Sequence, residues 1–401
     1  MTDTSLAGFN VDRLLQRFND KFGAGQSPAQ FFAPGRVNLI GDHTDYTGGY
    51  VFPCGIDTGS LLLIRRTHND QYRFASTNFD MFAQLSKDQI DKTYGDNWIN
   101  YPLGVVDQFV KRGINIDGID CLFSGNVPNA AGLSSSASIE VVTAFAINKL
   151  FNCEFSLLDL IKMSQAAEND FVGMQCGIMD QFAVAMAKQD HAILLNCDSL
   201  EHRQVPLKLD QHVLVLANTN QRRELNESAF NDRVAECARA LQLLQQRLPV
   251  NQLGELKLEQ LEKNRALFAD DPLAYQRAHH VCTENARVSA AVPALESGDM
   301  QLFGSIMNAS HESLRNHFHV SSEPLDYLVK AAHAQSGVVG SRLTGAGFGG
   351  CTVNLVERDW VTAFIENVGA DYQRLSGLTA DFYVIAPGDG VREILQANRH
   401  E

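Results

Sequence analysis

The spacing of hydrophobic positions changes along the chain, from a strand-like pattern in the first half to a helical one in the second. Short apolar runs predict strands at residues 30–33, 59–64, 72–76 and 121–124. We expect the runs at 59–64 and 72–76 to pair with each other. Apolar residues three and four positions apart predict helices at residues 9–22, 156–171 and 182–188. Ser156 and Asp159 look like a capping box at the start of the second of these helices. From residue 225 to 310 the pattern is helical almost throughout.

This change of pattern also predicts the domain organisation. A chain of 401 residues is longer than one hydrophobic core usually serves, so two packed domains are expected. The shift from strand-rich to helix-rich sequence near residue 205 places the boundary there. We therefore predict a first domain over residues 1–205 and a second over residues 206–401.

Composition and charge narrow the class of function. Hydrophobic residues make up 45% of the chain and charged residues 20%, which is typical of a soluble globular protein. The formal net charge of -14 disfavours nucleic acid and acidic membranes as partners, because their phosphates would be repelled. An anionic small ligand would therefore need local help from backbone amides, arginines or a divalent cation.

The sequence carries no recognisable targeting segment and no paired metal-binding cysteines. It has neither a signal-peptide pattern at its start nor a run of about 18 apolar residues, so we expect a cytoplasmic protein. The eight cysteines form no C-x-x-C pair, which predicts buried free thiols. His279 and His280 are adjacent, and neighbouring side chains on a helix point apart, so we expect no metal site there.

A stretch of small residues at 125–138 leads directly into the apolar helical run at 139–147. Glycine and alanine let the backbone curl close to a ligand, and the first turn of a helix offers unpaired amide groups, so this stretch suits a phosphate. Three adjacent serines add hydroxyl donors and a possible metal ligand. The alternative is an ordinary serine N-cap after a turn.

Two further segments carry candidate catalytic side chains. Between the apolar pieces of residues 34–50 lies a polar loop with Arg36, two aspartates and a histidine, which is either a functional loop or a charged hairpin tip. A glycine-bounded turn at 173–181 presents Asp180 just before a helix. Glu168 lies among small residues late in the preceding helix, where it is either a ligand or a solvated residue.

The late glycine-rich segment contains G-x-G-x-x-G, at residues 345–350. A dinucleotide-binding fingerprint opens a helix, whereas the residues that follow here, 351–356, are strand-like, so we reject that interpretation. A Walker A lysine loop and the protein-kinase H-R-D and D-F-G motifs are also missing from the sequence.

Four segments in order resemble the GHMP small-molecule kinases, and the first resembles the galactokinases in particular. They read P-G-R-V-N-L-I-G-D-H-T-D-Y at residues 34–46, G-N-V-P followed by G-L-S-S-S-A-S at 125–138, C-G-I-M-D-Q at 176–181 and T-G-A-G-F-G-G-C at 344–351. The resemblance covers nearly the whole chain. It implies an α+β fold with a first domain like domain 2 of ribosomal protein S5, a ferredoxin-like second domain, and a cleft for ATP and sugar between them.

The resemblance also implies a reaction and a set of site residues. The reaction is transfer of the γ-phosphoryl group of ATP to the C1 hydroxyl of α-D-galactose, with Asp180 as general base and Arg36 as its partner and transition-state stabiliser. Ser136 and Glu168 would hold Mg²⁺. The nucleotide would contact Ser76, Ala130, Ala131, Gly132, Leu133, Ser134, Ser135 and Ser136, and the sugar Asp42, His43, Thr44, Asp45 and Phe230. Phosphoryl transfer needs chiefly positioning and charge neutralisation, which these residue types provide.

Three positions depart from the family pattern. Asp42 stands where galactokinases have glutamate, Phe230 replaces the tyrosine of S-x-Y-N-x-R, and Ala130 replaces a glycine. Two alternatives therefore stay open. One is a GHMP kinase for a related sugar such as N-acetylgalactosamine, galacturonate or arabinose, and the other is a non-catalytic sugar-sensing regulator. We expect small-molecule partners only, and favour a monomer.

Overall fold

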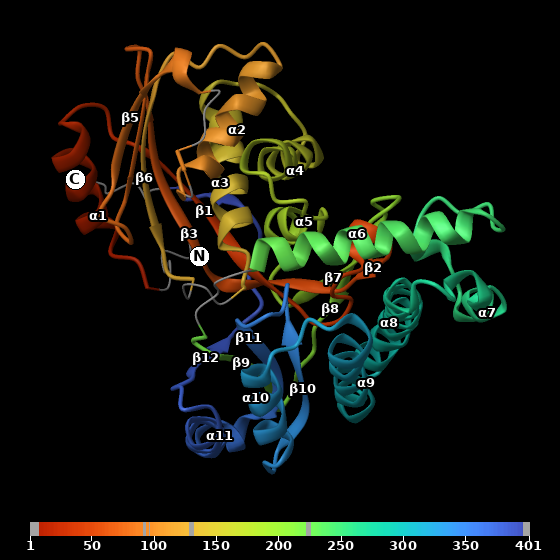
Figure 1. Ribbon diagram of the computed structural model, residues 1–401. Coiled ribbons are helices and arrows are strands. Elements are labelled where there is room, and N and C mark those ends of the chain that lie inside the picture. Colours follow the sequence, from red (N-terminus) through yellow and green to blue (C-terminus); the bar gives the residue numbers. More distant parts are fainter. Residues whose placement is uncertain (1–7, 91–93, 96, 128–131, 222–225, 396–401) are drawn as a thin grey trace.

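Three β-sheets form the framework of the molecule, seen in the computed structural model of Figure 1. The structure describes residues 8–90, 94–95, 97–127, 132–221 and 226–395. The largest sheet lies in the upper part of the view, a four-stranded sheet lies in the lower part, and a small sheet lies between them. The mixture of helices and sheets confirms the predicted α+β class.

The largest sheet has the strand order β13-β1-β3-β6-β4-β5. Its strands are β1 (Ala29–Asn38), β3 (Pro53–Arg66), β4 (Gln71–Ser76), β5 (Phe82–Ser86), β6 (Ile119–Gly125) and β13 (Arg392–Glu393). Neighbours are antiparallel except β4 and β6, which are parallel. The prediction that residues 59–64 and 72–76 pair with each other is wrong, because β6 lies between those two strands. Both runs are apolar enough to be interior strands, and only the tertiary fold decides their neighbours.

Helices cover both faces of this sheet. On one face lie α2 (Asn100–Lys111), α3 (Ser135–Leu150), α4 (Leu157–Ala166) and α5 (Met179–Met186), which share one hydrophobic core with the strands. The amphipathic α1 (Val11–Phe22) packs on the other face through Leu14, Phe18 and Phe22. The predicted capping box opens α4, where Ser156 and Asp159 bond each other's backbone N–H groups. The same helix continues as a π-helical segment over Ala167–Val172.

The lower sheet has the order β12-β9-β11-β10 and is antiparallel throughout. Its strands are β9 (His212–Asn218), β10 (Val338–Thr344), β11 (Cys351–Glu357) and β12 (Asp381–Ile385). Helices α10 (Glu323–His333) and α11 (Val361–Ser376) pack on one face. Numbered in chain order, these strands lie across the sheet as 4-1-3-2, and helices lie in the connections from β9 to β10 and from β11 to β12. This is the ferredoxin-like arrangement.

Four more helices fill the chain between β9 and β10, as predicted for residues 225–310. They are α6 (Asn226–Gln245), α7 (Leu258–Lys263), α8 (Pro272–Glu296) and α9 (Met300–Ser313). Helices α8 and α9 cover the second face of the lower sheet, because Val288, Phe303 and Met307 share a core with its strands. The small sheet, β2 (Tyr50–Val51), β7 (His191–Asn196) and β8 (His202–Pro206), contributes to the same core.

The strands change sheet between residues 206 and 212, where β8 ends and β9 begins. After β12 the chain returns to the largest sheet: Asp57 N donates to Ala386 O at 2.9 Å and Ile394 N to Gln30 O at 2.8 Å. We propose domains over 1–205 and 206–401, with this final strand added to the first domain's sheet.

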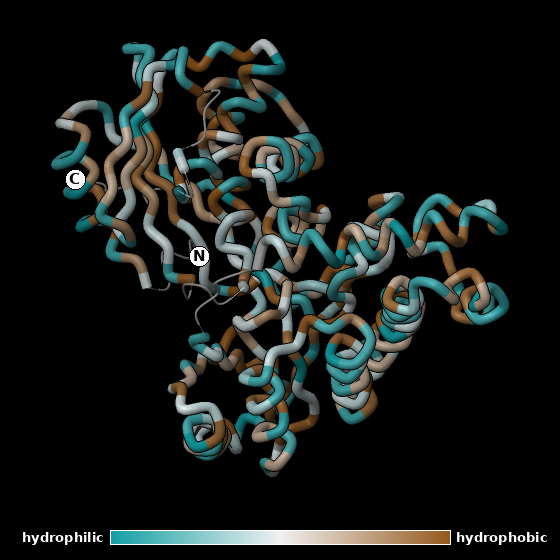
Figure 2. The backbone as a smooth tube through the Cα atoms, viewed as in Figure 1, coloured by the Kyte–Doolittle hydropathy of each residue, from teal (hydrophilic) through white to brown (hydrophobic). Residues whose placement is uncertain are grey.

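Hydropathy follows the layers of the fold. The strands of the largest sheet are mostly white and brown in Figure 2, whereas α1, α7 and α11 carry long teal stretches. Within the described part of the chain, no helix is long and apolar enough to cross a membrane. All eight cysteines lie in that part and are free thiols, five of them buried, in agreement with the prediction.

Candidate active site

Arg36 and Asp180 form a two-pronged ion pair where β1 meets the start of α5. Arg36 Nε donates to Asp180 Oδ1 at 2.9 Å, and Nη2 donates to Oδ2 at 2.8 Å. The Arg36 side chain is 5% exposed and the Asp180 side chain 27% exposed. The arginine is therefore held inside the protein while the carboxylate stays open to a ligand. Such paired bonds between guanidinium and carboxylate are strong and fix both side chains.

The serine-rich loop, within residues 125–138, is hydrogen-bonded to this ion pair. Arg36 Nη1 donates to Gly132 O at 2.8 Å, and Arg36 N donates to Leu133 O at 3.1 Å. Ser134 Oγ donates to Asp180 Oδ2 at 2.5 Å. Three donor atoms thus hold the Asp180 carboxylate, and contact of Ser134 with the nucleotide stays a prediction.

Ser134 occupies the N-cap position of α3, but its side chain does not cap the helix. Its backbone is left-handed, with φ 59° and ψ 46°, which is costly for a residue other than glycine. That conformation accompanies the bond from its hydroxyl to Asp180. The simple N-cap interpretation of this loop is therefore wrong for Ser134. Two further loop residues, Ala130 and Ala131, lie outside the described residues.

The glycine-rich loop between β10 and β11 closes the site from the lower domain, and its position before a strand is as predicted. Gly345 has φ +81°, and a Cβ at that position would lie 2.9 Å from Gly132 O, so the loop packs directly on the serine-rich loop. A Cβ on Gly347 would lie 2.3 Å from Val320 O. Glycine is thus required at both positions, because a side chain would clash with a backbone carbonyl oxygen.

Glu168 lies behind Asp180, at the start of the π-helical segment, and is 4% exposed. Its carboxylate shares a hydrogen bond with the Ser136 side chain and accepts one from Gln181 Nε2 at 2.6 Å. Burial, followed by the negative charge of Asp180, raises the pKa of Glu168 to about 7. The structure thus brings Ser136 and Glu168 together, and the solvated alternative for Glu168 is wrong. That the two residues hold Mg²⁺ stays a prediction.

The donor set around Glu168 fits Mg²⁺. Glu140 is buried nearby, and its Oε1 has no hydrogen-bond partner among the described residues. Burial, followed by the charge of Glu168, raises the pKa of Glu140 well above its usual value, so a second negative charge is costly here unless a divalent cation neutralises it. No group of three or more His, Cys, Asp or Glu side chains in the described ranges could hold a metal. Mg²⁺ needs fewer, because it is usually bound by one or two carboxylates together with substrate phosphates and water.

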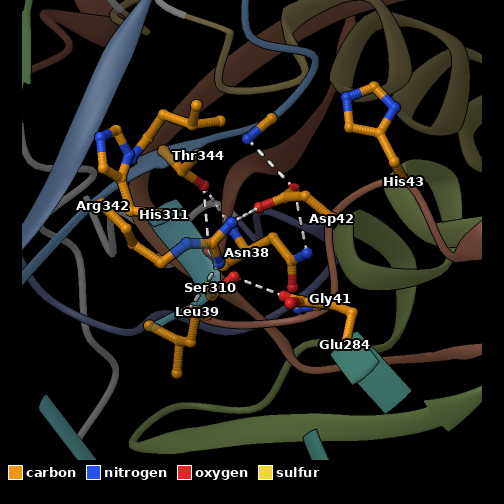
Figure 3. A network of polar contacts seen from close by, with 12 residues as sticks. Asn38, Leu39, Gly41, Asp42, His43, Glu284, Ser310, His311, Arg342 and Thr344 are labelled. Atoms are coloured by element: carbon orange, nitrogen blue, oxygen red, sulfur yellow. Dashed lines mark hydrogen bonds and ion pairs between the residues drawn. The ribbon is translucent and has the colours of Figure 1, made fainter. Parts of the chain in front are cut away.

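Asp42 points into the protein interior, as Figure 3 shows. It is 1% exposed and forms an ion pair with the buried Arg342 of β10. Its Oδ1 accepts from Asn38 Nδ2 at 3.1 Å and from Gly345 N at 3.2 Å, and Arg342 also donates to Leu39 O at 2.8 Å. Both carboxylate oxygens are thus engaged by the chain itself. A direct contact of Asp42 with a sugar stays a prediction.

His43 belongs to an aromatic cluster with Tyr46, Phe230 and Phe318. Its Nδ1 shares a hydrogen bond with Tyr46 Oη at 2.9 Å, and its ring centroid lies 5.6 Å from that of Phe230 and 4.8 Å from that of Phe318. Burial, followed by the charge of His280, lowers the pKa of His43 to about 3, so its imidazole is neutral at neutral pH. The structure therefore brings His43 and Phe230 together, as the predicted sugar site requires.

Thr44 and Asp45 have different surroundings. The Thr44 hydroxyl is bonded to the carbonyl groups of Gly41 and Tyr50 at 2.8 and 2.7 Å, which shapes the loop. The Asp45 side chain is partly exposed, and burial, followed by the charge of Asp180, raises its pKa to about 7. A Cβ on Gly177 would lie 2.8 Å from the backbone N of Tyr46, so glycine is needed beside this loop. Asp45 thus lies close enough to Asp180 for the two charges to interact.

Ser76 lies at the end of β4 and lines a small cavity together with Ser135 at the start of α3. Phe79 and Trp98 also line this cavity, with their rings stacked at an interplanar angle of 20°. The indole Nε1 of Trp98 is buried and has no hydrogen-bond partner among the described residues. Neither aromatic residue lies in a sequence motif, so no motif signal points to this cavity.

Comparisons with known proteins agree with this geometry. The N-terminal domain model of the GHMP kinases matches residues 100–188, their C-terminal model matches 291–373, and the galactokinase galactose-binding signature matches 16–66. A curated galactokinase of Fusobacterium nucleatum is 44% identical over 96% of this chain and 100% of its own, and that of Enterococcus faecalis is 45% identical over 95% and 99%. The chain belongs to the galactokinase family.

Solved structures agree with the family assignment. The structure of Lactococcus lactis galactokinase complexed with galactose superposes with a TM-score of 0.93 at 40% identity, covering 96% of this chain and 99% of that one. A Methanococcus jannaschii mevalonate kinase, at 18% identity and a TM-score of 0.65, covers 91% and 100% and shares the fold. The GHMP kinase fold predicted from the motifs is confirmed.

Proposed function

We propose that this galactokinase family member transfers the γ-phosphoryl group of ATP to the C1 hydroxyl of α-D-galactose, giving galactose 1-phosphate and ADP. The observation that carries the proposal is the Asp180 carboxylate, held by Arg36 and Ser134 where three motif loops meet. The similarity to curated galactokinases over nearly the full chain supports galactose as the sugar.

Asp180 is the proposed general base. Its carboxylate is oriented by Arg36 and remains partly exposed, so it can accept the proton of the attacking hydroxyl while its direction stays fixed. Arg36 is the proposed transition-state stabiliser, because its buried guanidinium places positive charge beside the reacting group without reorganisation. The loop amides of residues 132–136 would supply further donors to the phosphates.

Ser136 and Glu168 are the residues proposed to hold Mg²⁺. A bound Mg²⁺ would neutralise charge on the phosphates and help to orient the transferred group. On the nucleotide side we propose Ser76 and Ser135, together with the stacked Phe79 and Trp98, which could take up a flat base.

The sugar is proposed to lie between Asp45 and Asp180, against the aromatic cluster that contains His43 and Phe230. Asp45 is the best placed hydrogen-bond acceptor for adjacent hydroxyls, since it is partly exposed and close to Asp180. Cytoplasmic location and a monomeric state stay predictions from the sequence.

A coupled assay of ADP release tests the proposal. With Mg²⁺ and ATP present, galactose should be turned over in preference to N-acetylgalactosamine, galacturonate and arabinose, and the product should be the sugar 1-phosphate. Turnover of another sugar without galactose would favour a related GHMP kinase. No turnover at high enzyme concentration, with sugar binding retained, would favour a non-catalytic sensor.

Replacing the proposed metal ligands should raise the Mg²⁺ requirement. Ser136→Ala and Glu168→Gln should each increase the Mg²⁺ concentration that gives half-maximal rate, because each removes one oxygen ligand and Glu168→Gln also removes charge. Steady-state rates over a Mg²⁺ titration measure this. Asp170→Asn, an exposed position in the same π-helical segment, is the control. Unchanged titrations in both variants would contradict the metal role.

Phe230→Tyr should lower the KM for galactose with little change in kcat. Phe230 is 8% exposed and contacts the rings of His43 and Tyr46, so a hydroxyl there would lie beside the proposed sugar site. One neutral hydrogen bond is worth about 0.5 to 1.5 kcal/mol, or roughly 2- to 12-fold in binding. The variant should also discriminate better against deoxy sugars and epimers. Unaltered KM and selectivity would place Phe230 outside the sugar site.

A further inference from the structure

A buried amide connects two carboxylates directly behind Asp180. The Gln181 side chain is fully buried, and its Nε2 donates to Glu168 Oε2 at 2.6 Å and to Glu140 Oε2 at 3.0 Å. Glu140 is itself fully buried on α3, one helical turn after Ser136. A single side chain therefore joins the helix that carries Ser136 to the segment that carries Glu168.

Glu168 lies in an irregular stretch of backbone, where the hydrogen bond from Gln181 can help to fix the direction of its side chain. Glu168 lies in the π-helical segment that extends α4 and ends at Gly173, which has φ +95°. The wider π turn changes the direction of its side chains, and such turns are frequent at functional sites. Apart from its bonds with Ser136 and Gln181, the Glu168 carboxylate is contacted by Cys176 Sγ at 3.4 Å. A thiol is a weak donor, so Gln181 provides the short bond from the protein interior.

The buried position of Glu140 is energetically unfavourable. It lies in the hydrophobic core of the first domain, where a carboxyl group is costly to bury unless it is fully bonded. In the described part of the chain, neither its Oε1 nor the Oε1 of Gln181 has a hydrogen-bond partner. Packing alone would be served as well by an apolar side chain of the same size. What Glu140 adds is an acceptor that fixes the Gln181 amide.

We propose that Gln181 is a positioning residue that aims the Glu168 carboxylate at Ser136, and that Glu140 holds Gln181 in the required orientation. This inference rests on the proposed Mg²⁺ role of Ser136 and Glu168. Carboxylates that bind metals are themselves hydrogen-bonded, and loss of such a supporting partner typically costs about 10- to 100-fold in metal affinity or activity. The Gln181 amide has the geometry of that partner.

The test measures metal-dependent nucleotide binding without turnover. At a fixed ADP concentration, Mg²⁺ is titrated and the rise in the temperature of unfolding is followed. Gln181→Met keeps the length of the side chain but removes the N–H donors, so the Mg²⁺ midpoint should rise about 10-fold or more. Glu140→Gln is the matched control: its amide oxygen can still accept from Gln181, so its midpoint should stay within about 3-fold of wild type. Glu140→Met removes the acceptor and should shift the midpoint in the same direction as Gln181→Met.

Glu168→Gln separates failure of this inference from failure of the proposed function. If Glu168→Gln shifts the midpoint while Gln181→Met and Glu140→Met leave it unchanged, Gln181 has only a packing role and the inference is overturned. If none of the variants shifts it, the metal role of Glu168 itself is wrong. Gln181→Asn is the second variant in case Gln181→Met does not fold. Its amide is one methylene shorter and cannot span both carboxylates, so it should also raise the midpoint, and an unchanged value would again overturn the inference.

Discussion

Asp180→Asn should lower kcat for galactose phosphorylation by about 10²- to 10⁴-fold, the usual contribution of a general base. An asparagine of the same shape keeps one oxygen that can accept from Arg36 Nη2 and Ser134, whereas its NH₂ group cannot accept from Arg36 Nε. It also cannot take up the proton of the sugar hydroxyl. Steady-state ADP release measures kcat, and calorimetric titration with ADP measures nucleotide binding. We expect nucleotide binding and the unfolding temperature to change little.

Asp170→Asn provides the control for Asp180→Asn. It makes the same chemical change at an exposed position ten residues earlier and should leave kcat unaltered. If Asp180→Asn kept more than about a tenth of the wild-type kcat, the base assignment would be wrong. Positioning and charge neutralisation by Arg36 and the metal would then have to account for the rate.

Arg36→Met should have the second largest effect, a loss of about 10²- to 10³-fold in kcat, as found when one preorganised transition-state donor is removed. The change removes positive charge beside the reacting group, both bonds to Asp180 and the bond to Gly132 O. Arg36→Lys should recover only part of the activity, because one ammonium group cannot reproduce the paired geometry. The same ADP assay measures both variants.

Arg17→Met, an exposed position on α1, is the control for loss of one positive charge. Arg36 is buried and bonded, so the unfolding temperature of each variant must be measured alongside its rate. A folded Arg36→Met protein with near wild-type kcat would contradict the assigned role. Recovery of full activity by lysine would mean that charge alone, without the paired bonds, is what the reaction needs.

The local elements and the motif segments that meet at the candidate site could be predicted from the sequence. The spacing of Leu14, Phe18 and Phe22 predicted α1, and the Ser156 capping box predicted the start of α4, because both signals lie within one or two helical turns. The motif around Asp180 was recognisable because its chemistry is concentrated in a few adjacent residues.

Contacts between distant segments could not be predicted in this way. The pairing of β3 with β6 rather than β4 depends on which apolar strands meet in the folded sheet, and both choices satisfy the same hydrophobic pattern. The inward direction of Asp42 depends on Arg342, which lies 300 residues later in the chain. Trp98 carries no motif, and only the fold places it beside Ser76 and Ser135.

The sequence by itself determined the family, the helical and strand segments and the motifs that carry the proposed reacting groups, since these follow from local periodicity and from short motifs. The tertiary structure decided which of those groups face one another. It joined Arg36, Ser134 and Asp180 into one bonded unit, and it placed Glu140, an unremarked residue of α3, against Gln181 and Glu168. The physical reason is that hydrogen bonds and ion pairs act over about 3 Å in space. Separations of 41 to 144 residues along the chain carry no information about such distances until the core has packed.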